Sequence, residues 1–401
     1  MEYMYKKWFK NREKAAHEHA MIMQDETTVV LPFEISPMNY EGCFQLYYRP
    51  SNEMMVHLAQ VYQQDALLMQ LDGQLPGIAK DHFLRGMVVD EIFDSNALEN
   101  VQSTRAEIAE SVRLRQQGVP TKRRLSSMVY SYYGLAEDRL RLPATAADVR
   151  TIYDHVTEGE ITEEDLPDGQ LFRDGPVSVL SGVAGKRIHE GLVPETRISA
   201  AIEALLAFMD GSTLPDLIKI AVAHYYFGYV HPFYDGNGRT GRFISSLYLS
   251  KICSKYTAYS LSQGCRLAQR QYGELFKRSN DFRNYGEMNC FIEGFLQILV
   301  AGQMQIIENL QERRALLEQA ALHIQNDAWL VQDETKKNLM LIFEQGRLFD
   351  DYEEGFTQTM LQHYLPNDPK LRLRRSLDEL EAAGYIRRIK QRPITYVSMW
   401  V

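Results

Sequence analysis

An apolar run that meets a glycine-rich turn is the feature that most constrains the fold of this chain. Residues 216–230, DLIKIAVAHYYFGYV, are largely apolar and predict a buried helix. The helix must end at His231, because Pro232 disfavours the α conformation in the residue before it. The glycine-rich residues 236–241 predict a turn, and a second long helix is expected to begin near Arg239. Two helices joined by so short a turn indicate a mainly helical protein.

The rest of the chain is also mostly helical in its periodicity, with two exceptions. Residues 1–50 lack a clear period and predict an N-terminal arm with short extended pieces. Residues 165–197 are rich in glycine and proline, and their β-rich runs predict a hairpin. Elsewhere apolar residues recur at three- and four-residue steps, which predicts helices from about Asn52, from about Asp81 to Leu98, from about Thr104 to Gln116, and over 121–164, 198–210, 334–346 and 358–364.

The C-terminal region has a different pattern. Three helical segments, the last ending at Gly384, are followed by two β-rich pieces around Pro393. This is the order of a winged helix-turn-helix. The sequence therefore predicts an N-terminal arm and helical region over 1–120, a helical core over 121–325 and a winged-helix domain over 330–401.

Composition excludes several classes of protein. The chain has 401 residues, of which 45% are hydrophobic and 24% charged, so it is neither disordered, collagen-like nor a disulfide-framed miniprotein. Its net charge of −9 argues against nonspecific binding to nucleic acid or anionic lipid, so any basic surface must be local. The charged N-terminus is not a signal peptide, and we expect no membrane span. The four cysteines form no CxxC pair and are expected to be reduced, mostly buried thiols of a cytoplasmic protein.

Twelve consecutive residues, HPFYDGNGRTGR, combine several groups that can handle phosphate. His231 lies at a helix end beside the turn, so we expect its side chain to be accessible and not packed in the core. Residues Gly236–Gly238 can adopt positive φ and direct backbone N–H groups into one concavity, into which the dipole of the next helix also points. Arg239 and Arg242 share a helix face and can reach phosphate oxygens. Asp235 can hold Mg²⁺ together with substrate phosphates. The set predicts phosphate-ester transfer.

The same twelve residues resemble the signature of the Fic family, HPFx[D/E]GNGRxxR, with no departure at a fixed position. Most members are nucleotidyltransferases that move AMP from ATP to a Ser, Thr or Tyr hydroxyl of a protein. The resemblance implies that His231 is the general base, that Asp235 binds Mg²⁺ and that Phe233 packs under the loop. It also implies a Fic-type helical core and a nucleotide-binding set of Gly236, Asn237, Gly238, Arg239, Thr240, Gly241, Arg242 and Tyr272, with Arg242 on the γ-phosphate.

A second segment resembles the inhibitory motif of the family, [S/T]xxxE[G/N]. It comprises Ser95, Glu99 and Asn100 with the residues between them. In such members the glutamate pairs with the second arginine of the signature, here Arg242, and bars the γ-phosphate from its productive position. The resemblance thus implies the class in which an N-terminal inhibitory helix precedes the core. An exposed helix glutamate with no such role is the alternative.

Outside these two motifs the resemblance is looser. Tyr272 stands where relatives often carry a Tyr-Tyr pair near the adenine, and a role in the core is the alternative. The hairpin corresponds to the flap of the family, which aligns the target segment by strand pairing. Its candidate residues are Gly182, Gly185 and Lys186. We interpret His189 as a surface histidine of the hairpin, not as a second catalytic one.

The C-terminal region carries a local basic surface. Residues 370–392 contain eight basic and three acidic residues, which suits contact with a DNA backbone. Protein contact or dimerisation is the alternative use, and a homo-oligomer stays open. The sequence thus favours an autoinhibited adenylyltransferase that modifies a protein hydroxyl, and also itself. The alternatives are a DNA-binding regulator with a secondary Fic core, or an enzyme that removes AMP or transfers another phosphate-bearing group.

Overall fold

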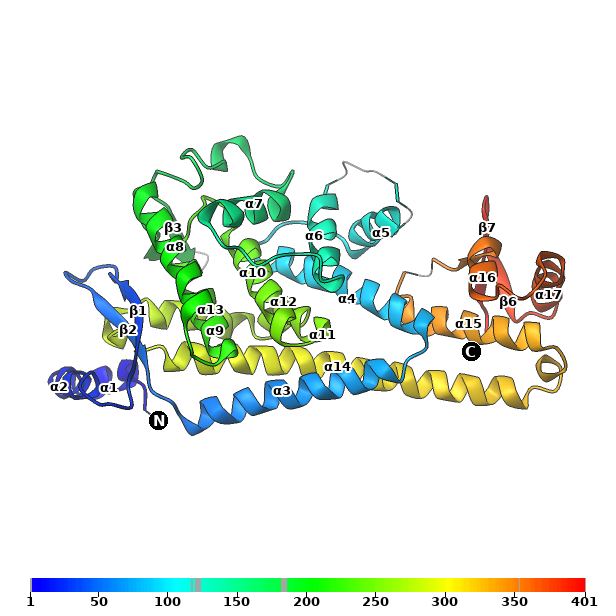
Figure 1. The fold of residues 1–401 in the computed structure, drawn as a ribbon, viewed down its shortest axis with the longest axis horizontal. Helices are drawn as coiled ribbons and strands as arrows, with labels where there is room; N and C mark the ends of the chain where they lie inside the picture. Colours follow the sequence, from blue (N-terminus) through cyan, green and yellow to red (C-terminus); the bar gives the residue numbers. More distant parts are fainter. Residues whose placement is uncertain (1, 117, 120–123, 182–185, 353, 401) are drawn as a thin grey trace. The chain divides into compact units, whose positions relative to one another are not determined.

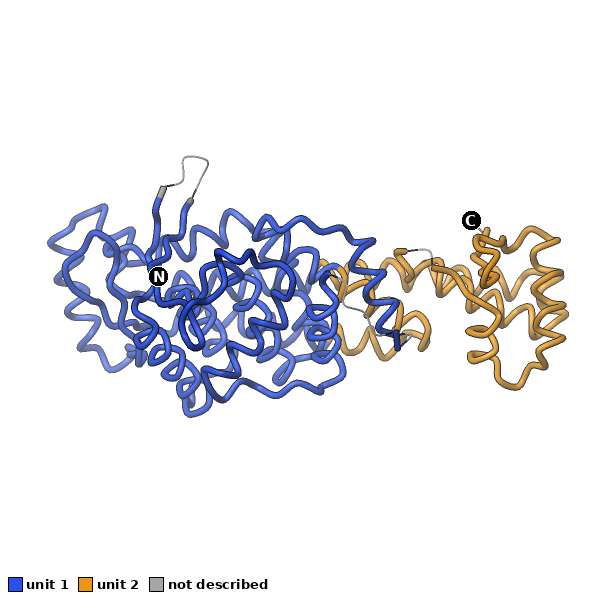
Figure 2. Tube along the Cα trace, turned by 90° about the horizontal axis from the view of Figure 1, so that it is seen from above, with its two compact units in different colours: residues 1–66, 90–304 blue, residues 67–89, 305–401 orange. Residues whose placement is uncertain are grey.

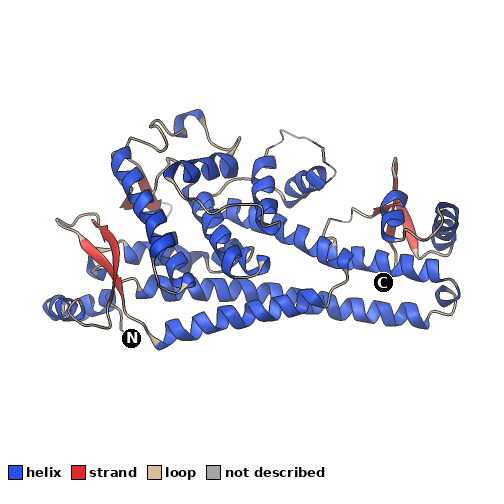
Figure 3. Cartoon of the chain, in the orientation of Figure 1, coloured by secondary structure: helices blue, strands red, loops and turns tan. Residues whose placement is uncertain are grey.

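The structure is a computed structural model that describes residues 2–116, 118–119, 124–181, 186–352 and 354–400. Over these residues it has 17 α-helices and three small β-sheets, which confirms the expected mainly helical class (Figures 1 and 3). The chain divides into two compact units (Figure 2). Unit 1 comprises residues 1–66 and 90–304, and unit 2 comprises residues 67–89 and 305–401.

The N-terminal arm of unit 1 is more helical than expected. It contains α1 (Met4–Lys10), α2 (Arg12–Ile22) and an antiparallel pair, β1 (Val29–Ile35) and β2 (Phe44–Tyr48). The two helices bury only one and two residues respectively, so their sequence carries little apolar periodicity. The interpretation of residues 1–50 as extended pieces was therefore wrong for α1 and α2 and correct for the hairpin.

The core of unit 1 consists of helices packed around α9. Eleven of the 15 residues of α9 (Asp216–Val230) are buried, which makes it the central helix of the unit. It packs against α8 (Glu195–Gly211) and α10 (Asn237–Ile252). The predicted hairpin is confirmed as β3 (Ser178–Ser181) and β4 (Lys186–Glu190), paired antiparallel. Further elements that lie wholly or partly in this unit are α3 (Asn52–Gly73), α4 (Gly77–Leu98), α5 (Arg105–Gln116), α6 (Ser126–Ala136), α7 (Ala146–Thr157), η1 (Glu163–Asp165), α11 (Lys255–Ala258), α12 (Leu261–Leu267), α13 (Gln269–Ser279), η2 (Phe282–Asn284) and α14 (Asn289–Asn326).

Helix α14 is the one helix in the described part of the chain that is long and apolar enough to cross a membrane. Its most apolar window has a mean hydropathy of 1.5, but 67% of that window is buried inside the protein. Such burial is the pattern of a core helix. We therefore interpret α14 as a core helix and not as a membrane span.

The cysteines differ from the expectation. Cys265 is buried, Cys43 is exposed, and Cys253 and Cys290 are half-buried, so the prediction of mostly buried thiols was wrong. All four are free thiols.

Unit 2 contains the C-terminal helices and a three-stranded sheet. The helices are α15 (Glu334–Phe349), α16 (Gln358–Tyr364) and α17 (Lys370–Ala382), preceded by the short η3 (Leu330–Gln332). The strands β5 (Phe356–Thr357), β6 (Ile386–Gln391) and β7 (Ile394–Ser398) form an antiparallel sheet in the order β5-β7-β6. The predicted element order is present, and the winged-helix name for it stays a prediction.

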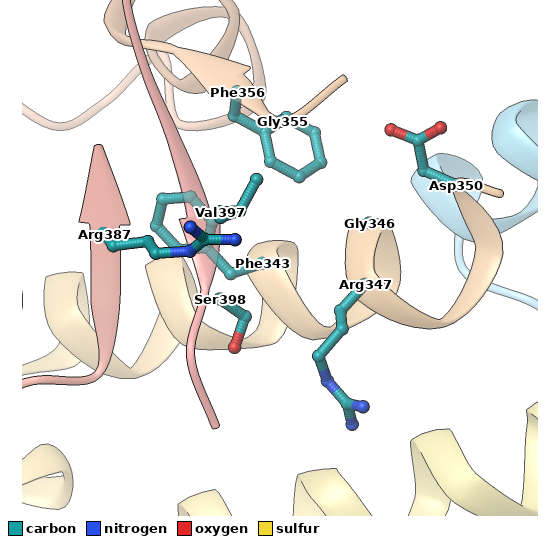
Figure 4. Close-up of a pocket in the computed structure, with 9 residues that line it drawn as sticks. All are labelled: Phe343, Gly346, Arg347, Asp350, Gly355, Phe356, Arg387, Val397 and Ser398. Carbon is teal, nitrogen blue, oxygen red and sulfur yellow. The ribbon is translucent and has the colours of Figure 1, made fainter. Parts of the chain in front are cut away.

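A small pocket of unit 2 lies between α15 and this sheet. Figure 4 shows the rings of Phe343 and Phe356 on its wall, with the guanidinium of Arg387 beside them. The nearby Arg347 is bound by the buried Glu344, whose Oε2 accepts from Arg347 Nε at 2.8 Å. The pocket therefore combines an aromatic wall with two arginines, of which Arg347 is paired with Glu344.

Candidate active site

Helix α9 presents His231 at its C-terminal end. The helix stops at Val230, and His231 adopts the left-handed conformation with φ 51°, as the following Pro232 requires a departure from the α region. The backbone N–H of His231 still bonds to Phe227 O at 2.9 Å. Its Nδ1 lies 3.3 Å from the carbonyl of Gly228, which can only accept, so Nδ1 donates and Nε2 is left as the proton acceptor.

The imidazole of His231 is neutral at physiological pH. Burial lowers its pKa well below the ordinary value, and the nearby His189 and Arg173 lower it further. A neutral ring whose Nε2 lone pair is free can act as a general base.

The loop after His231 is closed by its own side chains. Asn237 Oδ1 accepts from Phe233 N at 2.9 Å, and Asn237 Nδ2 donates to Phe233 O at 2.7 Å. The Phe233 ring is fully buried and stacks on Tyr153 with centroids 3.6 Å apart, which confirms its packing role. The side chain of Asn237 is thus used within the loop, and only its backbone N–H can serve a phosphate.

Helix α10 begins at Asn237, two residues earlier than predicted. Gly236 is its N-cap with φ 81°, a conformation that glycine adopts without strain, and no side chain caps the helix. Asn237 and Gly238 are helical, so the expectation of positive φ holds for Gly236 alone. The uncapped N–H groups of the first turn, with the helix dipole behind them, form an anion site.

Two members of the predicted nucleotide set face the interior instead. Thr240 is fully buried, and its hydroxyl donates to Gly236 O at 2.9 Å. A Cβ on Gly241 would lie 3.0 Å from the Phe227 ring, so this glycine permits close packing of α9 on α10. The Thr240 side chain and the space beside Gly241 serve the packing of α9 on α10, and nucleotide binding by these two residues stays a prediction.

Arg239 is a buried cation with unused donors. It is fully buried, and its Nη2 donates to Asp235 Oδ2 at 3.1 Å. Its Nε and Nη1 are buried and have no hydrogen-bond partner among the described residues. Buried guanidinium donors without acceptors are costly, so an anionic ligand is the natural partner for them.

Asp235 is the carboxylate placed beside this arginine. Its side chain is 45% exposed, so its oxygens remain accessible. No group of three or more His, Cys, Asp or Glu residues in the described ranges could hold a metal ion by itself. A single accessible carboxylate fits Mg²⁺ that shares its remaining ligands with substrate phosphates and water.

The structure brings Glu99 and Arg242 together. Arg242 is buried, and its Nη1 lies 2.9 Å from Glu99 Oε1. Ser95 accepts two further bonds from this guanidinium: Nε donates to Ser95 Oγ at 3.1 Å and Nη2 to Ser95 O at 2.9 Å. Burial opposes the charge of Arg242, but Glu99, together with Tyr272 and Cys265, outweighs this effect and raises the pKa of Arg242.

Glu99 also lies against the start of α10. A Cβ built on Gly238 would overlap the Glu99 carboxylate, so the carboxylate rests directly on the backbone of the first helical turn. Glu99 follows the last residue of α4, and Asn100 next to it adopts the left-handed conformation that ends a helix, with φ 58°. The residues of the second motif thus place one carboxylate on Arg242 and at the anion site together.

Helix α4 is anchored to α12 one turn before Ser95. Glu91 is fully buried, its Oε1 accepts from Ser262 Oγ at 2.6 Å and its Oε2 from Ser262 N at 3.0 Å. Burial raises its pKa to about 8. No feature of the sequence singled out Glu91, because a glutamate within an apolar helix carries no local signal of its partner.

Tyr272 lies near Arg242 and is bonded within the core. Its hydroxyl is 2.8 Å from His224 Nε2, and the opposite ring nitrogen of His224 is 2.8 Å from Ser245 Oγ. Burial raises the pKa of Tyr272, and its nearest charged neighbours include Arg242 and Glu99. The described contacts of Tyr272 are therefore those of a core residue at the edge of the site.

The hairpin differs from its interpretation in one residue. His189 is buried, and its Nε2 lies 2.6 Å from Tyr229 O, so the prediction of a surface histidine was wrong. Strand alternation directs its ring inward onto the end of α9. Gly182 and Gly185 lie outside the described residues, and Lys186 is described as the first residue of β4.

Comparison with known proteins finds a family match over part of the chain and a similar fold among solved structures. Residues 143–249 match the Fic/DOC family profile, which spans the hairpin, α9 and most of α10. A Fic family protein from Desulfovibrio desulfuricans G20 has the same fold, with 18% identity and a TM-score of 0.51 over 88% of this chain and 98% of that chain. A Fic domain containing signaling protein from Bacteroides thetaiotaomicron VPI-5482 (16%, TM-score 0.45, 63% and 97%) and Fic-1 from C. elegans (15%, 0.42, 64% and 74%) are weaker matches.

Proposed function

We propose that this Fic-domain protein transfers AMP from ATP to a hydroxyl of a target protein and is autoinhibited by Glu99. Fic-domain proteins generally transfer AMP or other groups onto proteins, and the matched residues 143–249 contain His231. The observation that carries the proposal is the placement of the Glu99 carboxylate. It binds Arg242 and rests on Gly238, so it stands in for a phosphate group of the nucleotide. A site that a carboxylate fills in this way is built for anions.

The chain supplies the groups that such a reaction needs. In this mechanism the target hydroxyl loses its proton to His231 Nε2 while its oxygen bonds to the α-phosphorus of ATP. The bond from the α-phosphorus to the bridging oxygen breaks, and pyrophosphate leaves. The free donors of Arg239 and the first turn of α10 bind the phosphate oxygens. Mg²⁺ held by Asp235 and the phosphates would supply neutralisation of their charge.

Autoinhibition follows from competition for one guanidinium. The γ-phosphate requires the donors of Arg242, and Glu99 and Ser95 already accept three hydrogen bonds from this guanidinium. ATP can then bind only with its γ-phosphate displaced, which turns the α-phosphorus away from the line of attack. A misplacement of about 1 Å can cost on the order of 10²-fold in rate.

Two alternatives have different support. Removal of AMP with Glu99 positioning water uses the same residues, so only the products distinguish it. A role in DNA binding is weakened by ion pairs in unit 2: Arg372, Arg375 and Arg388 are bound to carboxylates at 3.2, 2.8 and 2.7 Å. DNA contact and the cytoplasmic location stay predictions.

The test uses ATP labelled in the α- or the γ-phosphate with Glu99→Gly protein. The proposal expects protein-bound label from α-labelled ATP only, and loss of that label when His231→Ala is added. Nucleotide affinity should survive the second change, because arginines and backbone N–H groups bind the phosphates. Label from the γ-phosphate, or equal labelling without His231, would contradict the proposal. Release of AMP from a modified protein would favour the removal reaction.

A further inference from the structure

Arg173 lies under the residue that we propose as the base, and it holds the backbone there. Its Nε donates to His231 O at 2.9 Å and its Nη2 to Val230 O at 3.4 Å. Its Nη1 donates to Gly175 O at 2.5 Å, and its own backbone N–H bonds to Pro232 O at 3.1 Å. One residue thus holds three consecutive carbonyl groups, on either side of and at His231.

Strand β4 and the residues after it complete this arrangement. His189 Nε2 donates to Tyr229 O at 2.6 Å, and Leu192 N donates to Val230 O at 3.1 Å. The last carbonyls of a helix have no partner within the helix and need donors from elsewhere. Here all the carbonyls from Tyr229 to Pro232 receive them from residues 173–192. The base of the hairpin and the end of α9 therefore form one hydrogen-bonded unit.

The charge of Arg173 is unusual for a structural residue. The side chain is fully buried, and its hydrogen bonds all go to backbone carbonyl groups and none to a carboxylate of the described residues. Burial lowers the pKa of Arg173 to about 10, and the more distant Tyr234 and Asp168 oppose this shift. Burying an unpaired cation is costly, and an apolar residue would fill the same space at lower cost. Its position at the C-terminal end of α9 offsets part of that cost, because the helix dipole favours a cation there.

Gly191 shows how closely the parts fit. A Cβ on this residue would overlap Arg173 Nη2 and would lie 3.0 Å from His231 Cβ. The chain therefore leaves no room between the guanidinium and His231, and any side chain at position 191 must displace one of them.

We propose that Arg173 and His189 are positioning residues that hold His231 in its left-handed conformation with Nε2 directed to the reacting hydroxyl. The inference rests on the proposed function, because it assigns His231 the role of base. Arg173 acts through the carbonyls of residues 230–232, and His189 acts through Tyr229. The same unit joins the base to the hairpin, so the target segment and His231 share one support.

The charged and titratable neighbours of His231 come from the same unit. His189 on β4 and Arg173 in the loop before β3 both disfavour a second proton on the His231 ring, as does burial. Burial lowers the pKa of His189 to about 4, so this ring is neutral at pH 7. Tyr234 and Asp168 raise the pKa of Arg173 and are not among the groups that shift the pKa of His231. Arg173 therefore carries the fixed positive charge whose removal tests how this unit controls the pKa of His231.

The test compares variants in the Glu99→Gly protein. Arg173→Lys keeps the charge but loses the fork that reaches several carbonyls. Gly191→Ala keeps Arg173 and displaces its guanidinium. We expect both to lower the turnover of AMP transfer by on the order of 10²-fold, with the Kd of ATP within about twofold of the parent. Arg197→Lys, at an exposed arginine, and Gly211→Ala, where no atom lies within 4 Å of the added carbon, are the controls and should keep the parent rate.

A second readout does not depend on AMP transfer. The pKa of the His231 ring, followed by NMR of labelled histidine, should rise in Arg173→Gln and stay low in Arg173→Lys. His189→Leu should shift the His231 resonance, and His189→Gln, which retains a donor, should restore much of it. Parent turnover in Arg173→Lys and Gly191→Ala with an unchanged His231 resonance would overturn the proposal. If Glu99→Gly protein transfers no AMP at all, the proposed function fails, and the NMR titration still decides the positioning role.

Discussion

Replacement of the buried Glu91 by glutamine should remove the part of the pH dependence of stability that comes from this carboxyl group. Glu91 is fully buried between α4 and α12, and its pKa is raised from about 4.5 to about 8. A raised carboxyl pKa means that the native state keeps a proton that the unfolded chain releases. The stability that this proton contributes is fully present below pH 4.5 and is lost as the pH rises through about 8.

The magnitude follows from the width of that interval. Each pH unit between the two pKa values corresponds to about 1.4 kcal/mol, so wild type should lose at most about 4 kcal/mol from this group between pH 5 and pH 8. Glutamine copies the protonated carboxyl: its oxygen can accept from Ser262 N, and its amide can donate to Ser262 Oγ. Glu91→Gln should therefore match wild type near pH 5 and exceed it at pH 8.

Urea unfolding followed by circular dichroism at pH 5, 6, 7 and 8 measures this difference. The buried histidines contribute equally to both proteins, so they cancel in the comparison. Glu308→Gln, at an exposed carboxylate of α14, is the matched control and should leave the curve unchanged. Parallel curves for wild type and Glu91→Gln would refute the reasoning. A loss of several kcal/mol in the variant at pH 8 would instead show an ionised Glu91 that depends on Arg242.

Three further predictions concern other parts of the chain. Acidification from pH 6.5 toward pH 4 should cost stability at the buried histidines, because burial lowers the pKa of His189 to about 4 and that of His224 to about 3 while the unfolded chain takes up protons near pH 6.5. In Glu91→Gln protein, which lacks the opposing contribution of Glu91, the urea midpoint at pH 5 should fall below that at pH 7. Asp235→Ala should weaken Mg²⁺-dependent turnover several-fold, and equal rates in a chelator would exclude the metal role. If unit 2 binds DNA, the double change Lys370→Gln and Arg374→Gln in the full chain should abolish a duplex shift seen at about 50 mM salt.

The backbone of residues 231–242 could be predicted from sequence because the signals that shape it are local. Pro232 fixes where α9 ends, and the glycine-rich turn fixes where α10 begins to within two residues. The side-chain bonds of Asn237 to Phe233, in contrast, became visible only in the structure. Local signals predict the path of the backbone, but they do not show which polar side chains form hydrogen bonds within the loop.

Contacts across the chain could be predicted only where a family motif named both partners. Glu99 and Arg242 are 143 positions apart, and nothing in the periodicity of α4 requires them to meet. Arg173 and Glu91 have no motif, so neither was found, although each makes several bonds in the core. His189 was placed on a hairpin correctly, but a strand pattern does not say that one ring reaches the end of α9.

The rate of AMP incorporation into wild type, Glu99→Gln and Glu99→Gly tests the central claim most directly. Arg242 keeps its two bonds to Ser95 in both variants, so the fold should change little, and melting curves check this. We predict that Glu99→Gly raises the rate by at least on the order of 10²-fold, because the γ-phosphate then reaches Arg242. Glu99→Gln should activate less, since its amide oxygen can still accept from the guanidinium. Equal rates in all three proteins would contradict the account and would leave residues 95–100 as an ordinary helix end.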